Sequence, residues 1–173
     1  MDVILVDEND VQVGTMEKLE VHQKALLHRA FSIFIFNAKA EMLLHKRAAN
    51  KYHSAGLWTN ACCSHPAPGE ETLEAAQNRL QEEMGICTNL KKIFDFTYKA
   101  VFDNGLTENE FDHVFLGQYD GTVSPNKEEV SDYCFKSIAD IKDSIQTHPQ
   151  KYTEWFKIAF PKLEEYLVKK TVT

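Results

Sequence analysis

What this sequence lacks narrows its function. It has no basic excess, because 19 Lys and Arg residues stand against 26 Asp and Glu residues, a formal net charge of −7. General nucleic-acid binders and proteins of anionic membranes need basic surface, so we expect neither kind of partner. No apolar run approaches the roughly 20 residues of a membrane span, and we expect no signal peptide at the start. An anionic small molecule stays compatible with this charge, because a few local cations suffice to bind it.

The sequence also lacks a disulfide pattern. Its four cysteines have no paired spacing, and the adjacent Cys62 and Cys63 could bridge each other only under strain. Unpaired thiols are typical of a reducing compartment, so we expect a cytoplasmic protein. We find no repeats, low-complexity segments or linkers, and 173 residues are enough for one domain with a sizeable core.

The apolar pattern predicts a mixed α/β domain with a helix on each side of the sheet. Expected strands are 3–6 and 11–14 as a hairpin, then 29–36, 41–46, 58–66, 90–102 and 108–118. A short helix is expected within 16–26, and longer helices at 72–84, 137–146 and 153–169. The rest of the last third, including 119–136, is expected to be loop.

The segment 58–66 (WTNACCSHP) concentrates reactive side chains. Because side chains alternate along a strand, Cys63 and His65 share one face and Cys62 points to the other, buried side. Pro66 ends the strand, and an acidic helix with Glu83 near its end follows. A thiol, an imidazole and carboxylates therefore converge within one strand-to-helix unit.

Two carboxylates on a later strand suggest a metal site. Glu108 and Glu110 are two residues apart, so they point to the same side, where they repel unless a cation compensates. Together with His22, His28 and His65 they form a set of three nitrogens and two oxygens, which suits Mn²⁺, Fe²⁺ or an expanded Zn²⁺ site. The alternative is that both carboxylates face solvent and the histidines are scattered.

Basic and aromatic residues lie where an anionic substrate could use them. Arg47 and Lys51 follow one expected strand, Arg79 lies on the acidic helix, and Lys18 precedes His22 by one helical turn. Such residues bind phosphate groups, although a solvated basic loop is the commoner outcome. Trp155 is either a core residue or an aromatic wall facing a cation.

Taken together, the order and spacing of these motifs resemble type I isopentenyl diphosphate isomerase, a branch of the Nudix superfamily, over nearly the whole chain. The resemblance implies a Nudix-type α/β/α sandwich around a mixed β-sheet with an N-terminal β-hairpin extension. It implies a single domain over 1–173, with its core at about 27–158. The implied reaction interconverts isopentenyl diphosphate and dimethylallyl diphosphate by protonation and deprotonation through a tertiary carbocation, in isoprenoid precursor biosynthesis.

The resemblance also implies roles for individual residues. One divalent metal, Mn²⁺ or Zn²⁺ with Mg²⁺ as a further option, would be held by His22, His28, His65, Glu108 and Glu110. Mg²⁺ would bind the substrate diphosphate together with Glu83 and a backbone atom of Cys63. The diphosphate itself would meet Lys18, Arg47, Lys51 and Arg79. The catalytic residues would be Cys63, Glu110, Tyr98 supporting the glutamate, and Trp155 over the reacting carbons. We expect a monomer or weak dimer.

Departures from the Nudix hydrolase motif bear on the alternatives. That motif has Arg-Glu ahead of its final Glu-Glu, whereas this chain has Asn78-Arg79, and Ser64 replaces the leading glycine. A pyrophosphohydrolase of a nucleoside diphosphate derivative is therefore the disfavoured alternative. A non-catalytic metal-binding module is a further alternative, but it would not need Cys63 and Glu110 together.

Overall fold

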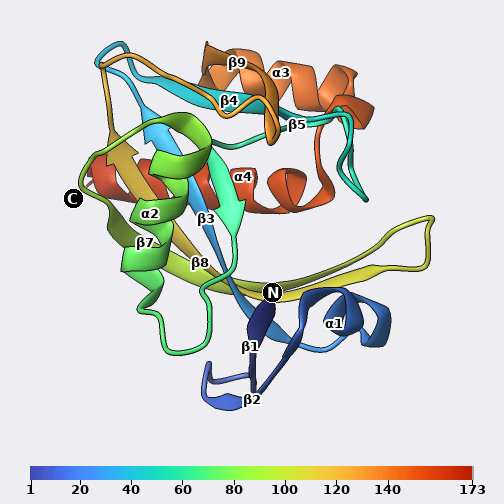
Figure 1. Cartoon of the computed structure of the whole chain (residues 1–173). Coiled ribbons are helices and arrows are strands. Elements are labelled where there is room, and N and C mark those ends of the chain that lie inside the picture. The colour runs from blue at the N-terminus through green and yellow to red at the C-terminus, as the bar shows by residue number, and fades with distance from the viewer. Residues whose placement is uncertain (173) are drawn as a thin grey trace.

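The computed structural model describes residues 1–172 (Figure 1). Within this range the strands are β1 (Asp2–Val6), β2 (Gln12–Glu17), β3 (His28–Phe36), β4 (Glu41–Arg47), β5 (Trp58–Thr59), β6 (Cys62–Ser64), β7 (Lys91–Val101), β8 (Thr107–Gln118) and β9 (Val130–Ser137). The helices are α1 (Lys18–Lys24), α2 (Thr72–Met84), α3 (Ile138–Thr147) and α4 (Glu154–Val172), with a 3₁₀ turn at Pro149–Lys151.

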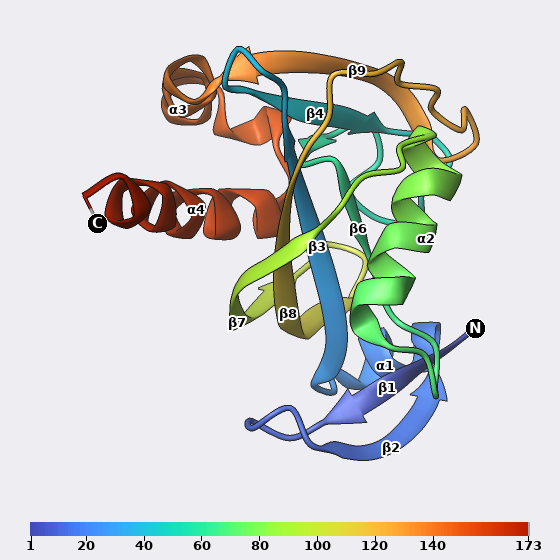
Figure 2. The same ribbon diagram turned by 90° about the vertical axis from the view of Figure 1, so that its left-hand side faces the viewer.

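Strand β3 is the centre of a mixed sheet. It runs parallel to β8 and antiparallel to β6, and short contacts join it to β1 and β4. Helix α2 covers one face of the sheet and α4 the other, as Figure 2 shows. The expected α/β/α sandwich is thus confirmed, and so is the N-terminal hairpin, in which β1 pairs with β2.

Burial on both faces explains the composition of β3. Eight of its nine residues are buried, and the run from Ala30 to Phe36 does not alternate between buried and exposed positions. A strand covered by helices on both sides is expected to be a nearly continuous apolar run. Helix α4 supplies Phe156, Phe160 and Leu163 to its side of the core, at the spacing of one helical stripe. The core therefore consists of two apolar layers with β3 between them.

The end of α2 is fixed tightly, and this positions Glu83. Gly85 follows the helix at φ +66°, and a Cβ there would lie 2.9 Å from the Ser124 backbone oxygen. The backbone amides of Ser124 and Asn126 donate to the carbonyls of Met84 and Glu83, at 2.9 and 2.8 Å. The loop after β8 thus caps the helix end that carries the Glu83 carboxylate.

Two expectations about strands are wrong. Residues 130–137 form β9, which pairs with β4 from Glu41 opposite Ser137 to Arg47 opposite Val130. This edge strand is mostly exposed, so it lacks the buried alternation that marks a strand in sequence. The segment 58–66 is also not one strand, because β5 pairs with β4 whereas β6 pairs with β3. Asn60 lies at the break, where its Nδ2 donates to the backbone oxygens of Ile33 and Cys62.

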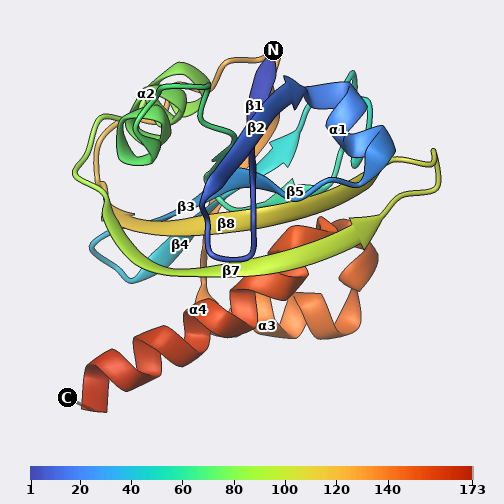
Figure 3. The ribbon, with the colours of Figure 1, turned by 90° about the horizontal axis from the view of Figure 1, so that it is seen from below.

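The N-terminal unit lies against the sheet near the turn between β7 and β8. Figure 3 shows α1 beside these two long, curved strands. The side chain of Asn109 on β8 donates to the backbone oxygen of Ala25 at 3.0 Å, which fastens the end of α1 to the sheet. Helix α1 thereby reaches the same region as Glu108 and Glu110. Among the described residues, no helix is long and apolar enough to cross a membrane.

Candidate active site and metal centre

One cavity collects most of the predicted site residues. Strands β6, β7 and β8, helices α1, α2 and α4, and the loop after β4 all contribute to its wall. The predicted residues that line it are Lys18, Arg47, Lys51, Cys63, His65, Arg79, Glu83, Tyr98, Glu108, Glu110 and Trp155. His22 and His28 lie behind this wall and are both buried. The fold thus brings together residues that are distant in sequence.

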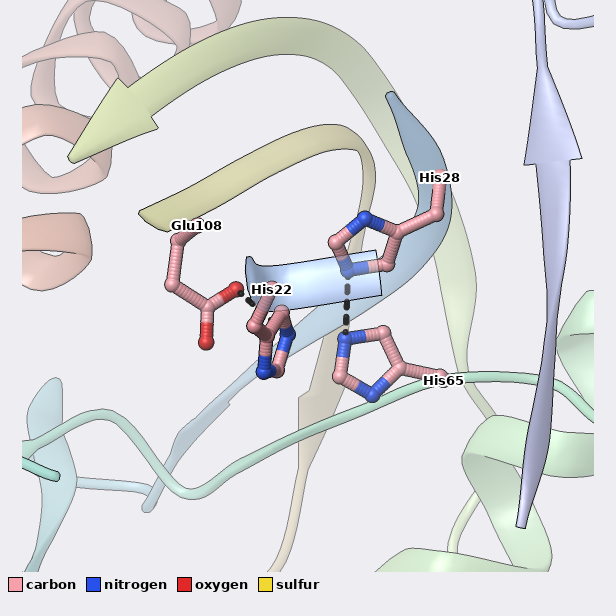
Figure 4. Close-up of side chains that lie close together, drawn as sticks. All are labelled: His22, His28, His65 and Glu108. Atoms are coloured by element: carbon pink, nitrogen blue, oxygen red, sulfur yellow. Dashed lines mark hydrogen bonds and ion pairs between the residues drawn. The ribbon is translucent and has the colours of Figure 1, made fainter. Parts of the chain in front are cut away.

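Three histidines and a glutamate form a compact cluster. One ligand atom from each of His22, His28, His65 and Glu108 lies within 4.8 Å of every other. Figure 4 shows the four side chains converging from α1, β3, the segment after β6, and β8. Glu110 lies at the edge of the cluster, with its Oε1 3.7 Å from His65 Nε2. The structure therefore brings all five predicted metal ligands into one region.

The chemistry of this cluster fits a divalent cation. Glu108 and Glu110 are only 4% and 7% exposed, so the alternative that they face solvent is wrong. His22 Nε2 and Glu108 Oε2 are buried without a hydrogen-bond partner, and their separation of 3.7 Å is too long for such a bond. Burial lowers the pKa of His22 to about 4, so its imidazole is neutral and offers a lone pair. Unpartnered lone pairs around a buried carboxylate are what a metal ion satisfies.

Backbone contacts select the nitrogen that faces the cluster. His28 Nδ1 lies 2.9 Å from the Leu26 carbonyl oxygen, which accepts only from a protonated nitrogen. The Nε2 of His28 is therefore the atom with the free lone pair, and it lies 3.2 Å from His65 Nε2. A hydrogen bond that fixes the tautomer of a histidine is typical of metal ligands.

The surroundings of Glu110 favour its protonated form. It lies opposite Tyr98 in the β7–β8 pairing, and the Tyr98 hydroxyl donates to its Oε1 at 2.9 Å. Burial, followed by the nearby negative charge of Glu108, raises the pKa of Glu110 well above its usual range. Hydrogen bonds from Glu110 and His53 instead lower the pKa of Glu108. These effects favour protonation of Glu110 over protonation of Glu108.

Cys63 faces the cavity from β6, as strand alternation predicts. Its Sγ lies 3.1 Å from Asn60 Oδ1 and 3.5 Å from Ser32 Oγ. Burial, with a smaller contribution from the negative charge of Asp112, raises the pKa of this thiol to about 12, so it keeps its proton in the substrate-free protein. Cys62 points the other way into the core under α2, where its Sγ lies 3.2 Å from Glu83 Oε2. The expectation that the two adjacent thiols diverge is confirmed.

Four cationic side chains are part of the cavity wall. The Arg47 guanidinium lies 5.1 Å from the centre of the Trp155 ring. Lys51 forms an ion pair with Glu129, and Arg79 forms one with Glu83. The four predicted phosphate-binding side chains thus line the cavity, in contrast to a solvated basic loop: Lys18, Arg47, Lys51 and Arg79.

The sequence analysis missed His53, which lines the cavity, and Asp112, which contacts the lining residue Ser32. His53 Nε2 lies 3.1 Å from Glu108 Oε1, yet it belongs to a loop without periodicity that could have indicated its direction. Asp112 is fully buried and accepts from Ser32 Oγ at 2.7 Å. It continues the two-residue spacing of Glu108 and Glu110 along β8, so strand alternation could have found it.

Comparison with known proteins places the chain in a family. Residues 26–156 match the NUDIX domain. The chain is 49% identical to an isopentenyl-diphosphate Delta-isomerase of Pectobacterium atrosepticum, over 95% of this chain and 92% of that protein. It is 51% identical to isopentenyl-diphosphate Delta-isomerase 1 of Aromatoleum aromaticum, over 90% of this chain and 88% of the relative.

The fold agrees with this placement. A crystal structure of the MutT protein from Methanosarcina mazei matches with a TM-score of 0.67 at 20% identity, covering 80% of this chain and 94% of that one. At such low identity the likeness concerns the fold alone. The isomerase relatives, by contrast, are about half identical over most of the chain, and this identity shows the family as well as the fold. The chain belongs to the type I isopentenyl-diphosphate Delta-isomerase family of the Nudix superfamily.

Proposed function

We propose that this protein interconverts isopentenyl diphosphate and dimethylallyl diphosphate by proton addition and removal. The observation that supports it most is that Cys63 and Glu110 line one cavity from different strands, beside a metal-type cluster and a group of cations. Curated relatives of about 50% identity carry the isomerase name. The hydrolase alternative is not favoured, because Arg79 occupies a position where that motif has a glutamate, and it pairs with Glu83.

The reaction needs two proton-transfer groups. An unactivated alkene is a weak base, so a positioned acid must protonate one end, and the tertiary carbocation must then lose a proton at the other. We assign protonation to Glu110, whose pKa is raised by burial and by Glu108 and which receives a hydrogen bond from Tyr98. Cys63 accepts the proton from the allylic carbon.

This assignment requires Cys63 to be deprotonated in the reactive complex. Burial raises the pKa values of both Cys63 and Glu110 in the substrate-free protein, whereas a donor and an acceptor need one proton between them. Arg47 lines the same cavity as Cys63, and a nearby cation favours a thiolate. The assignment requires that the thiol gives its proton to solvent before it takes the allylic proton.

Two divalent metals complete the proposal. At the His/Glu cluster a bound Mn²⁺ or Zn²⁺, or alternatively Mg²⁺, would withdraw electron density from Glu110 and sharpen its acidity. The residues that would hold it are His22, His28, His65, Glu108 and Glu110. Mg²⁺ would accompany the diphosphate at Glu83 and the Cys63 backbone, where the Arg79 cation now neutralises the Glu83 carboxylate. The diphosphate would be bound by Lys18, Arg47, Lys51 and Arg79.

Trp155 is proposed to stabilise the carbocation with its ring face. Its side chain is buried at the cavity wall, and the Arg47 guanidinium already lies over the ring. We expect Trp155→Ala to lower turnover by about 10- to 100-fold, since a desolvated cation–π contact contributes about 2 kcal/mol or more. The turnover of Trp155→Phe should lie between that of the Ala variant and that of the original protein. Steady-state kinetics measure this. An Ala variant with full turnover would contradict the role.

The function itself is tested by isotope incorporation. The protein with divalent metal is incubated with isopentenyl diphosphate in deuterated water, and the products are analysed by NMR and mass spectrometry. We expect dimethylallyl diphosphate carrying deuterium, because the added proton exchanges with solvent through the acid group. Release of free phosphate or pyrophosphate without isomerisation would instead support the hydrolase.

Three further proposals come from the sequence. We infer a cytoplasmic location, a monomer or weak dimer, and one domain in which the hairpin and C-terminal helix pack on the Nudix core. Sedimentation of the purified protein checks the second of these.

A further inference from the structure

We propose that Tyr52 and His53, in the loop between β4 and β5, are positioning residues for the metal centre. Each hydrogen-bonds a different predicted ligand and leaves the other polar atom of that ligand free to face the cluster. This inference rests on the proposed metal-binding role of His22, His28, His65 and Glu108. It adds a second layer of residues that sequence analysis did not find.

His53 determines which oxygen of Glu108 is available. Its Nε2 lies 3.1 Å from Glu108 Oε1, and both side chains are buried. The other oxygen, Oε2, is buried without a hydrogen-bond partner and points toward His22 Nε2 at 3.7 Å. One carboxylate oxygen is thus occupied by the loop, and the second is presented to the cluster. Carboxylates that bind metals are typically oriented in this way.

Tyr52 acts on His22 in the same manner. Its hydroxyl lies 3.1 Å from His22 Nδ1, while His22 Nε2 has no partner. A metal needs the lone pair of Nε2, so the hydrogen of the neutral imidazole must sit on Nδ1. The Tyr52 oxygen accepts that hydrogen and therefore stabilises the metal-binding tautomer.

The loop is fastened to the strand that carries Glu108. The His53 ring stacks on Phe102 at 4.7 Å and 9°, close to the turn between β7 and β8. Asn104 in that turn donates from Nδ2 to the Tyr52 backbone oxygen at 3.0 Å. Phe102 and Asn104 lie in the turn that leads into β8. The loop that carries Tyr52 and His53 is therefore fixed relative to the strand that carries Glu108. Two successive residues that each contact a different ligand are poorly explained by packing alone.

A matched pair of substitutions separates the hydrogen bond from the packing. His53→Phe keeps a ring to stack on Phe102 but loses the donor to Glu108. His53→Gln loses the ring but can place an amide donor where Nε2 lies. The metal-free proteins are titrated with Mn²⁺ alone, and free Mn²⁺ is followed by its electron paramagnetic resonance signal. We expect about tenfold weaker binding for His53→Phe, as for other partners of metal ligands. His53→Gln should stay within about threefold of the original protein, since its hydrogen bond is kept.

Two more variants make the result decisive. His22→Gln removes a ligand and should abolish binding at the cluster, which identifies the site being titrated. Tyr52→Phe deletes only one hydroxyl and should weaken binding severalfold without affecting thermal unfolding of the metal-free protein. If the original protein binds Mn²⁺ but His53→Phe and Tyr52→Phe bind equally well, the positioning roles are wrong while the metal centre stands. If the original protein binds no Mn²⁺, the metal centre and this inference both fail.

Discussion

Cys63→Ala is expected to lose at least about 1,000-fold in turnover while it still binds isopentenyl diphosphate, since a positioned acid–base group contributes about 10²–10⁴-fold. The thiol faces the cavity from the middle of β6, and alanine fits its place without disturbing the backbone pairing of this position with Ser32 on β3. Lost proton transfer, not lost folding, therefore accounts for the defect. Steady-state kinetics with a binding titration by calorimetry measure both quantities.

The adjacent thiol supplies the control. Cys62 is equally close in sequence but lies in the core under α2, away from the cavity lining. Cys62→Ala should lower thermal stability, because a buried side chain loses contacts, yet keep most of the turnover. A fully active Cys63→Ala protein, or the reverse order of the two variants, would remove the thiol from the mechanism.

Strand alternation explains why part of the site was predictable. A period of two residues fixes which side chains share a face, so Cys63 separates from Cys62, and Glu108 joins Glu110, whatever the rest of the fold does. The same rule would have found Asp112. Helix α2 was predicted with its end at Gly85, because a left-handed cap and an amphipathic run are local features.

The unpredicted parts depend on non-local partners. Strand β9 exists because β4 offers an edge, and its own exposed, mixed residues give little sign of it. The break between β5 and β6 depends on Asn60, whose side chain replaces strand hydrogen bonds with bonds to Ile33 and Cys62. The spacing of residues in the sequence cannot reveal that a side chain takes over backbone hydrogen bonds in this way.

The remaining site residues were harder to place from the sequence. His22 on α1 and His28 at the start of β3 were candidate ligands by residue type, and the family resemblance supported them, because no periodic pattern shows that either points toward Glu108. His53 was missed altogether, because the loop that carries it obtains its shape from contacts with the turn between β7 and β8. Loop geometry is determined by tertiary contacts, and function concentrates there.

The carboxyl group of Glu110 is expected to be as indispensable as the thiol. Glu110→Gln retains the volume of the side chain and an oxygen that accepts from Tyr98, but it cannot give up a proton. We expect turnover to fall at least about 1,000-fold. Mn²⁺ binding at the cluster should persist in weakened form, because His22, His28, His65 and Glu108 still converge there.

Comparison with Tyr98→Phe distinguishes proton transfer from support. Tyr98 only donates a hydrogen bond to Glu110 Oε1, so its loss should lower turnover about fivefold, in line with a net contribution of about 1 kcal/mol for such a bond. The deuterium experiment adds a second readout, because a Glu110→Gln protein should no longer label the product. If Glu110→Gln isomerised and incorporated deuterium within tenfold of the original protein, another group would have to deliver the proton. The raised pKa of Glu110 would then be a result of its burial and of its neighbour Glu108, and not a preparation for catalysis.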